Sequence, residues 1–452
     1  MVASARPRSG ARPDPRSLAR DVLLRVETSE AFADVLLAAR LAEAELTPAD
    51  QALATRLVYG TLAWQLRLDT CLGALTTRPL ARVDPPVRVA LRLGLFQQLF
   101  LDRIPVHAAV HTSVALAPPR ARGFVNAVLR RAARLGRAEL LAPIDAADPA
   151  LRLALEWSHP PWLVGQWLAE MGEAETRALL AANAEPPRTA IRVNSSRTTR
   201  TDLQSELARA GIESDPSPWL SDALIVRSGA GRLRTTAAWY EGRFAFQSEA
   251  SQLVARLLAP QPPWRVLDAC AAPGGKSTLL ASWMGDAGLV MALDRRLGGA
   301  RRIAREAARL GTAAVRIMVG DARRPPLAAP VDAILVDAPC TGLGTLRRHP
   351  ELRWRRGPQD SARLAELQSQ ILAGVAPLVR SGGVLVYAVC TLSREENEAV
   401  VEAFLAREPR FEPESAAAFV PAALVDRSGF VRTLPHRHGL DGFFAARLRA
   451  RG

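Results

Sequence analysis

Apolar residues recur at three-to-four spacing between Leu18 and about Arg137, and arginine-rich polar positions lie between them. One such stripe consists of Val87, Leu91, Leu95 and Leu99. This period matches the turn of an α-helix, and the proline pairs at 85–86 and 118–119 fall where helices begin or end. The pattern therefore predicts an all-α bundle over residues 18–140.

The pattern changes over residues 141–243. A helix carrying Trp162 and Trp167 is expected first, then an extended segment at Ile191–Asn194 and a second helix starting near Thr201. Mixed periods of this kind are typical of a small α+β domain. We expect residues 141–243 to form a connector that acts as an RNA-binding subdomain.

From about Phe244 onward, short apolar runs alternate with helical stretches. The expected strands are 266–269, 289–293, 315–319, 333–336, 384–388 and 443–448. Such alternation is typical of βαβ units, whose mainly parallel sheet is covered by helices on both faces. Residues 244–452 are therefore predicted to form an α/β domain with a Rossmann-like sheet.

Length and charge narrow the class of protein. A chain of 452 residues is long enough for about three structural units. Lysine and arginine outnumber acidic residues by 59 to 45, a net charge of +14, which favours a polyanionic partner such as RNA. The first 17 residues are rich in arginine and proline and are expected to be a disordered arm.

No targeting, membrane or metal signal is readable. The chain has no run of eighteen apolar residues and no secretory signal, so we expect a cytoplasmic protein without a membrane partner. Its four cysteines are scattered and lack the spacing of a disulfide framework or a zinc site. Reduced thiols and no bound metal are expected.

The first strand of the α/β domain runs into a loop of small residues. Its sequence is Cys270-Ala271-Ala272-Pro273-Gly274-Gly275-Lys276. Small residues ahead of a helix let a ligand approach the backbone closely, and Lys276 is the one lysine of the chain. A phosphate-binding P-loop is rejected because it requires a glycine where Cys270 stands.

Two carboxylates follow the next strands. Asp294 lies twenty residues after Gly274, the spacing at which a carboxylate accepts hydrogen bonds from a ribose diol. Asp321 follows the third strand and is placed to reach an adenine edge, although it could equally cap its own loop. Together with the small-residue loop, they predict a nucleoside-binding site.

Two cysteines are expected at the carboxyl ends of strands. Cys340 belongs to the segment Asp337-Ala338-Pro339-Cys340 after the fourth strand, and Cys390 ends the fifth. Open α/β sheets place their ligand crevice at these ends. Asp337 and the two thiols therefore indicate thiol chemistry beside a nucleoside cofactor.

These motifs resemble those of the S-adenosylmethionine-dependent RNA cytosine-5 methyltransferases. The segments that carry the resemblance are 270–276, 337–344, 390–391 with 395–398, 347–354 and 438–444. The helical bundle resembles the NusB-type RNA-binding fold, and the domain order resembles the bacterial RsmB (Sun/Fmu) type of ribosomal RNA methyltransferase. Departures from the family pattern at Ser248, Val389 and Thr391 affect substrate orientation and remove no reacting group.

The resemblance implies S-adenosylmethionine as cofactor and a role for each motif residue. Cys390 matches the nucleophile, Asp337 would hold the cytosine edge, Cys340 would assist release of the covalent adduct, and Lys276 falls inside the catalytic site. The residues implied in cofactor binding are Cys270, Ala271, Ala272, Pro273, Gly274, Gly275, Lys276, Asp294, Asp321 and Asp337.

The expected substrate is RNA. Five arginines around Trp354, within 347–356, suit phosphate contacts and base or ribose stacking, with simple burial of Trp354 as the alternative. We expect a monomeric enzyme that makes 5-methylcytosine in small-subunit ribosomal RNA. The alternatives are transfer RNA as the substrate, or a non-catalytic NusB-like protein that binds RNA during assembly.

Overall fold

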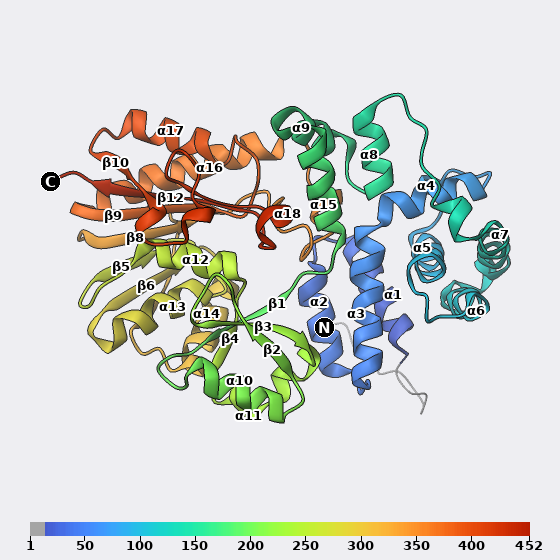
Figure 1. Cartoon of the computed structure of the whole chain (residues 1–452), viewed down its shortest axis with the longest axis horizontal. Coiled ribbons are helices and arrows are strands. Elements are labelled where there is room, and N and C mark those ends of the chain that lie inside the picture. The colour runs from blue at the N-terminus through green and yellow to red at the C-terminus, as the bar shows by residue number, and fades with distance from the viewer. Residues whose placement is uncertain (1–13) are drawn as a thin grey trace, which may run out of the picture. The chain divides into compact units, whose positions relative to one another are not determined.

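The structure, a computed structural model, describes residues 14–452 (Figure 1). Two compact units make up this chain. The first runs to Ala184 and includes Arg348–Trp354, and the second holds Glu185–Arg347 and Arg355–Gly452. The division falls inside the predicted connector, 141–243, whose first helices join the first unit and whose sheet joins the second.

The predicted arm, residues 1–17, lies mostly outside the described residues. Its last part is ordered, because the first helix begins at Pro15 and not at Leu18. The Asp14 carboxylate accepts the backbone N–H groups of Arg16 and Ser17, and Pro15 suits the first helical position because it lacks an N–H group.

The first unit is built from helices. They are α1 (Pro15–Thr28), α2 (Ala33–Glu43), α3 (Pro48–Ala63), α4 (Gln65–Leu75), α5 (Pro85–Phe100), α6 (Val106–Leu116), α7 (Arg122–Leu140), α8 (Pro149–Trp157) and α9 (Pro161–Ala184), with α15 (Leu352–Arg355) lying across the unit boundary. The predicted bundle is confirmed, and each residue of the stripe from Val87 to Leu99 is buried on α5.

Close approach of helices explains two glycines. A Cβ atom on Gly60 of α3 would lie 2.0 Å from the Phe96 ring of α5, and one on Gly94 of α5 would lie 2.4 Å from Leu129 of α7. Only glycine leaves room for these contacts. Helix α5 is thereby packed tightly on both neighbours at the centre of the bundle.

A small antiparallel sheet opens the second unit, in the order β2-β3-β1-β4. Its elements are β1 (Thr189–Val193), β2 (Glu213–Pro216), β3 (Ala223–Ser228), β4 (Phe244–Phe246), α10 (Arg200–Arg209) and α11 (Ala237–Tyr240). Leu203 and Leu207 of α10 pack with Ile191 and Phe244 of the sheet. This confirms the predicted α+β connector fold.

The large sheet follows. Its strands are β5 (Arg265–Asp268), β6 (Leu289–Asp294), β7 (Val315–Val319), β8 (Val331–Asp337), β9 (Val379–Val389), β10 (Phe411–Glu414), β11 (Val431–Thr433) and β12 (Phe443–Ala450). They lie in the order β10-β12-β9-β8-β5-β6-β7, and β11 pairs with β12. Strands β5 to β9 pair in parallel, whereas β12 runs antiparallel to β9. The predicted Rossmann-like sheet is confirmed.

Helices cover both faces of this sheet, because successive buried residues of β9 join cores on opposite faces. Val386 joins the core that includes α12 (Glu249–Leu258), α13 (Gly275–Met284) and α14 (Leu297–Leu310). Tyr387 joins the opposite core with α16 (Asp360–Val375) and α17 (Glu398–Arg407). The short α18 (Pro435–His438) precedes β12. No helix within residues 14–452 is long and apolar enough to span a membrane.

Candidate active site

The candidate site lies in the second unit, at the carboxyl ends of its parallel strands. Strand β5 is flanked by β6 on one side and β8 on the other, so the connections after β5 and β8 leave in opposite directions. In open α/β sheets this switch point is where a crevice for ligands forms. The loops after β5, β8 and β9 carry the residues that the sequence singled out.

The loop after β5 is pinned to its neighbouring strands. The Ala269 N–H group donates to Leu335 O at 2.9 Å, and the Ala271 N–H group donates to Leu293 O at 2.9 Å. Gly274 has φ +110° and a Cβ atom there would lie 3.1 Å from the Ile303 backbone, so only glycine suits the position. Helix α13 begins at the next residue, which directs its N-terminus toward the crevice.

Asp268, which the sequence analysis did not select, ends β5 beneath this loop. Its side chain is 1% exposed, and its Oδ2 atom accepts the Ser277 hydroxyl at 2.6 Å. Its Oδ1 atom is buried without a hydrogen-bond partner among the described residues. Burial raises the pKa of Asp268 to about 6, against the opposing effects of Ser277 and Lys276. The signal in the sequence was an acidic residue at the end of an apolar strand.

Lys276 forms an ion pair with Asp337, which ends β8. The lysine is the more buried partner, with 11% of its side chain exposed against 26% for Asp337. Burial alone would lower the pKa of Lys276, but Asp337, Asp268 and the Cys390 sulfur together raise it. The lone lysine therefore places a fixed positive charge near a carboxylate and a thiol.

The two cysteines predicted to act together lie side by side. The Sγ atoms of Cys340 and Cys390 are 3.3 Å apart, and the Gly344 N–H group donates to Cys390 O at 3.0 Å. The hydrogen bond with Cys390 and burial raise the pKa of Cys340 well above its usual value. Cys340 thus stays a thiol in contact with the Cys390 sulfur.

A buried glutamate, Glu396, holds the two cysteine loops together. Its Oε2 atom accepts the Thr341 N–H group at 2.9 Å and the Gln368 side chain at 3.0 Å, and its Oε1 atom accepts the Thr341 hydroxyl. Thr341 also contacts Thr391 Oγ1 at 2.8 Å. Each threonine follows a cysteine, so this network, which we call the Glu396 framework, fixes the backbone beside both thiols. The sequence motif contained Glu396, but its partners are distant in the chain.

The two carboxylates predicted for the nucleoside have different surroundings. Asp294 ends β6 and accepts the Arg296 N–H group at 2.8 Å, and Gly299 faces it, where a Cβ atom would lie 2.2 Å from Asp294 Oδ1. Asp321 instead forms an ion pair with Arg323, whose hydrogen bonds lower the pKa of Asp321 to about 2. Burial raises the pKa of Cys270, so this thiol stays protonated.

In the basic stretch around Trp354, the contacts of Arg353 and Trp354 differ from those that the sequence predicted. The Arg353 side chain is 1% exposed and donates to the backbone carbonyls of Ala63, Ser158 and Asn183 at 2.8–3.1 Å. The Trp354 indole donates to Leu62 O at 2.8 Å. The phosphate role predicted for Arg353 was wrong, because a count of charges along the chain does not reveal which side chains are buried. The stacking role predicted for the partly exposed Trp354 stays a prediction.

An open sheet of this order, with a small-residue turn before α13 and reactive groups after β8 and β9, defines a methyltransferase domain. Residues 255–449 match the family described as 16S rRNA methyltransferase RsmB/F. Residues 13–134 match the NusB family, and residues 159–231 match the ferredoxin-like domain of RsmF/B-like methyltransferases.

Similar proteins agree with these matches. The chain is 39% identical over 448 residues to "Probable ribosomal RNA small subunit methyltransferase B" of Bacillus subtilis, covering 97% of this chain and 99% of that protein. It is 36% identical to "Ribosomal RNA small subunit methyltransferase B" of Pseudomonas syringae, covering 96% of each. The crystal structure of PH0851 has a TM-score of 0.81 at 25% identity and covers 97% of this chain and 100% of its own.

The chain belongs to the 16S rRNA methyltransferase RsmB/F family. The predicted family is confirmed, and so is the prediction of an RNA methyltransferase with a NusB-like helical domain. The domain boundaries and the roles of individual residues stay predictions.

Proposed function

We propose that this chain transfers a methyl group from S-adenosylmethionine to carbon-5 of a cytosine in small-subunit ribosomal RNA, through a covalent adduct with Cys390. Membership of the family and the names of its relatives support the substrate class. One observation carries the chemistry. Two thiols lie 3.3 Å apart beside the Lys276–Asp337 ion pair.

The loop after β5 fits the proposed cofactor. Gly274 lets the loop turn closely against Ile303, Asp294 has no side chain opposite it at Gly299, and Asp268 offers a buried oxygen without a partner among the described residues. Bound S-adenosylmethionine would supply an electrophilic methyl group. Asp294 would accept hydrogen bonds from its ribose diol, and Asp321 would have to exchange Arg323 for the adenine edge.

Carbon-5 of cytosine is a poor nucleophile, so the base must first be activated. The Cys390 thiolate would add to carbon-6, which forms a C–S bond and moves electron density to carbon-5 and ring nitrogen-3. The activated carbon-5 would then take up the methyl group, with the demethylated cofactor as the leaving group. Loss of the carbon-5 proton and cleavage of the C–S bond restore the aromatic ring and the Cys390 thiolate.

Lys276 and Asp337 would serve this addition together. Asp337 would hold the cytosine edge and, with the ammonium bound to it, favour protonation of ring nitrogen-3 as negative charge develops there. The same ammonium lies close enough to Cys390 for the sulfur to raise the pKa of Lys276. By reciprocity, Lys276 stabilises the Cys390 thiolate.

Cys340 would assist release of the adduct by accepting the carbon-5 proton. Its pKa is raised by its hydrogen bond to Cys390, by burial and by the charge of Cys390. When Cys390 becomes a neutral thioether, the effects of its charge and its hydrogen bond disappear. Cys340 then ionises more readily, at the stage where a base is required.

The proposal has two alternatives, and one experiment separates them. Tritiated methyl transfer would be measured with purified small-subunit ribosomal RNA and, separately, with transfer RNA, followed by nucleoside analysis. Label in 5-methylcytosine from ribosomal RNA alone is the expected result. Label from transfer RNA alone would overturn the substrate, and cofactor binding without label in either RNA would favour the non-catalytic, RNA-binding alternative.

A further inference from the structure

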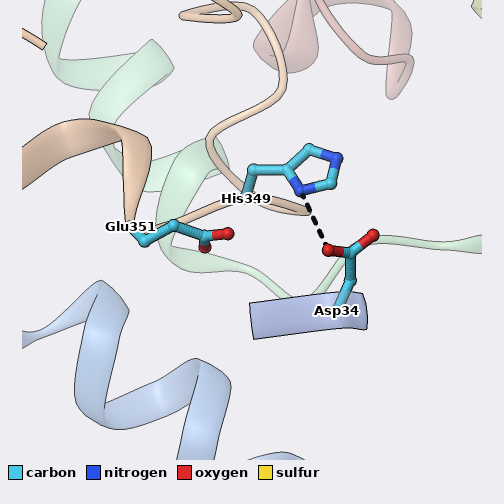
Figure 2. A group of neighbouring side chains, drawn as sticks. All are labelled: Asp34, His349 and Glu351. Atoms are coloured by element: carbon cyan, nitrogen blue, oxygen red, sulfur yellow. Dashed lines mark ion pairs between the residues drawn. The ribbon is translucent and has the colours of Figure 1, made fainter. Parts of the chain in front are cut away.

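A short segment of the chain, Arg348–Trp354, belongs to the helical unit although its neighbours in sequence belong to the other. It brings His349 and Glu351 to the start of α2, where Asp34 lies in the first turn (Figure 2). The Glu351 Oε1 atom accepts the Ala33 N–H group at 3.1 Å, which fixes the glutamate against α2. The His349 ring packs edge-on against Phe32 at 6.2 Å.

Three side-chain atoms converge between these two segments. Asp34 Oδ1, His349 Nδ1 and Glu351 Oε2 each lie within 4.8 Å of the other two, and the His349 and Asp34 atoms are 4.0 Å apart. All three atoms are buried and have no hydrogen-bond partner among the described residues. Glu351 itself is 1% exposed. Leaving a buried carboxylate oxygen unsatisfied costs about 1–3 kcal/mol or more, so this arrangement calls for a cationic ligand.

The two carboxylates of the site also act electrostatically on a neighbouring side chain. The neighbouring Tyr59 has its pKa raised by burial and then by the charges of Asp34 and Glu351, whereas Arg348 acts in the opposite direction. The site also lies near the surface, since 42% of the Asp34 side chain and 30% of the His349 side chain are exposed. An ion could therefore enter past these two residues and reach the buried Glu351.

We propose that Asp34, His349 and Glu351 bind a divalent transition-metal ion, with Zn²⁺ as the best fit. One imidazole nitrogen and two carboxylate oxygens suit Zn²⁺, whereas Mg²⁺ and Ca²⁺ prefer oxygen ligands alone. Tetrahedral Zn²⁺ with bonds of about 2.0–2.2 Å would place its ligand atoms about 3.4 Å apart. The His349–Asp34 separation of 4.0 Å exceeds this by about 0.6 Å, and no separation exceeds it by more than about 1.4 Å. The partly exposed Asp34 and His349 side chains can make such a movement, and water would complete the shell.

The proposed ion would join Arg348–Trp354 to α2 within the helical unit, so its role is structural and independent of methyl transfer. A ligand that binds only the folded state stabilises that state in proportion to the logarithm of its concentration over its Kd. Zn²⁺ should therefore raise the melting temperature of the full chain. This effect should require all three ligand residues.

The test uses full-length, tag-free protein that has been stripped with a chelator. Both active-site thiols are replaced, Cys340→Ala and Cys390→Ala, because a cysteine pair would itself bind Zn²⁺. Calorimetric titration with Zn²⁺, and with Co²⁺ as a spectroscopic probe, should give one ion per chain with micromolar or tighter Kd. His349→Ala and Glu351→Gln should each weaken binding by about 100-fold.

Two further variants keep the result interpretable. His107→Ala removes an exposed histidine on α6 and should leave the affinity unchanged. Asp34→Asn changes a partly exposed residue, so the fold should survive, and should weaken binding about tenfold. No binding at 100 μM Zn²⁺ (about the weakest useful affinity), or binding that survives His349→Ala, Glu351→Gln and Asp34→Asn, would overturn the proposal.

Discussion

Two buried glutamates organise two different regions of this molecule, and they differ in how completely they are satisfied. Glu396 is 0% exposed and Glu351 is 1% exposed, and burial raises the pKa of both. Glu396 has hydrogen-bond donors on both carboxylate oxygens, from Thr341 and Gln368. Glu351 has a donor on Oε1, whereas Oε2 faces Asp34 and His349 without one.

This difference distinguishes the Glu396 framework from the binding site that we propose at Glu351. A buried polar group whose partners all come from the chain holds its neighbours in one arrangement, as Glu396 does for the two cysteine loops. Glu351 differs, because one of its buried oxygens faces two other potential ligand atoms and, among the described residues, no donor. Such a group requires a further partner. Completeness of hydrogen bonding, and not burial, therefore distinguishes the two regions.

The largest expected effect comes from the reacting group that the Glu396 framework positions. Cys390→Ala should lower the rate of methyl transfer by about 10⁴-fold or more, because it removes the thiol proposed to add to carbon-6. Single-turnover transfer of tritium measures this, and titration of S-adenosylmethionine should show unchanged affinity. Cys71→Ala, a change in the helical unit, is the matched control and should retain activity.

The second region also contains a buried arginine, Arg353, which donates to three backbone carbonyl groups. Arg353→Met removes a buried guanidinium and leaves three carbonyl groups without donors, so the unfolding free energy should fall by about 4 kcal/mol. Urea denaturation followed by circular dichroism measures the loss. Arg134→Met, on the exposed side of α7, should change it by less than about 0.5 kcal/mol. An equal loss in both variants would contradict the structural role.

One carboxylate oxygen of Asp268 accepts a hydrogen bond and the other has no partner among the described residues. This buried carboxyl group should make the stability of the fold depend on pH. Its pKa of about 6 exceeds the usual value of an aspartate, so the folded chain binds this proton more tightly than the unfolded chain. The stabilisation is present below about pH 4 and is lost as the pH rises through 6, a change of about 3 kcal/mol. Asp268→Asn should remove this slope when urea midpoints are compared between pH 4 and pH 7. Parallel curves for the two proteins would show that the shift is absent.

The smallest expected effect tests the framework itself. Glu396→Gln keeps the shape of the side chain but turns one acceptor into a donor, which opposes a donor of Thr341 or Gln368. We expect kcat to fall about tenfold with little change in KM for RNA, since the framework positions the thiols and does not touch the substrate. Glu366→Gln, on the exposed face of α16, is the control. A change confined to KM would assign Glu396 to substrate binding.

Local patterns in the sequence predicted most of the fold. The strands at 266–269 and 384–388 were read from apolar runs, and the loop from Cys270 to Lys276 was read from adjacent small residues. The pairing of Lys276 with Asp337 and of Cys340 with Cys390 followed from strand ends that meet at one edge of a parallel sheet. Short-range patterns of this kind can be read from a single sequence.

Long-range contacts could not be predicted in the same way. Thr341 and Glu396 are 55 residues apart, and Ala33 and Glu351 are 318 apart, so no spacing rule relates them. The expectation of no metal rested on cysteine and histidine spacing, which does not detect the site that we propose at Asp34 and His349. The phosphate role predicted for Arg353 failed for a related reason, because its three partners come from distant helix ends.

The central claim is that Cys390 forms the covalent adduct and Cys340 releases it. The most direct measurement is denaturing gel electrophoresis of the Cys340→Ala variant after incubation with small-subunit ribosomal RNA and S-adenosylmethionine. We predict a protein–RNA adduct that resists denaturation and that is absent when Cys390→Ala is added to the same chain. An adduct that forms in the Cys390→Ala single variant would contradict the assignment, because Cys340 would then be the nucleophile.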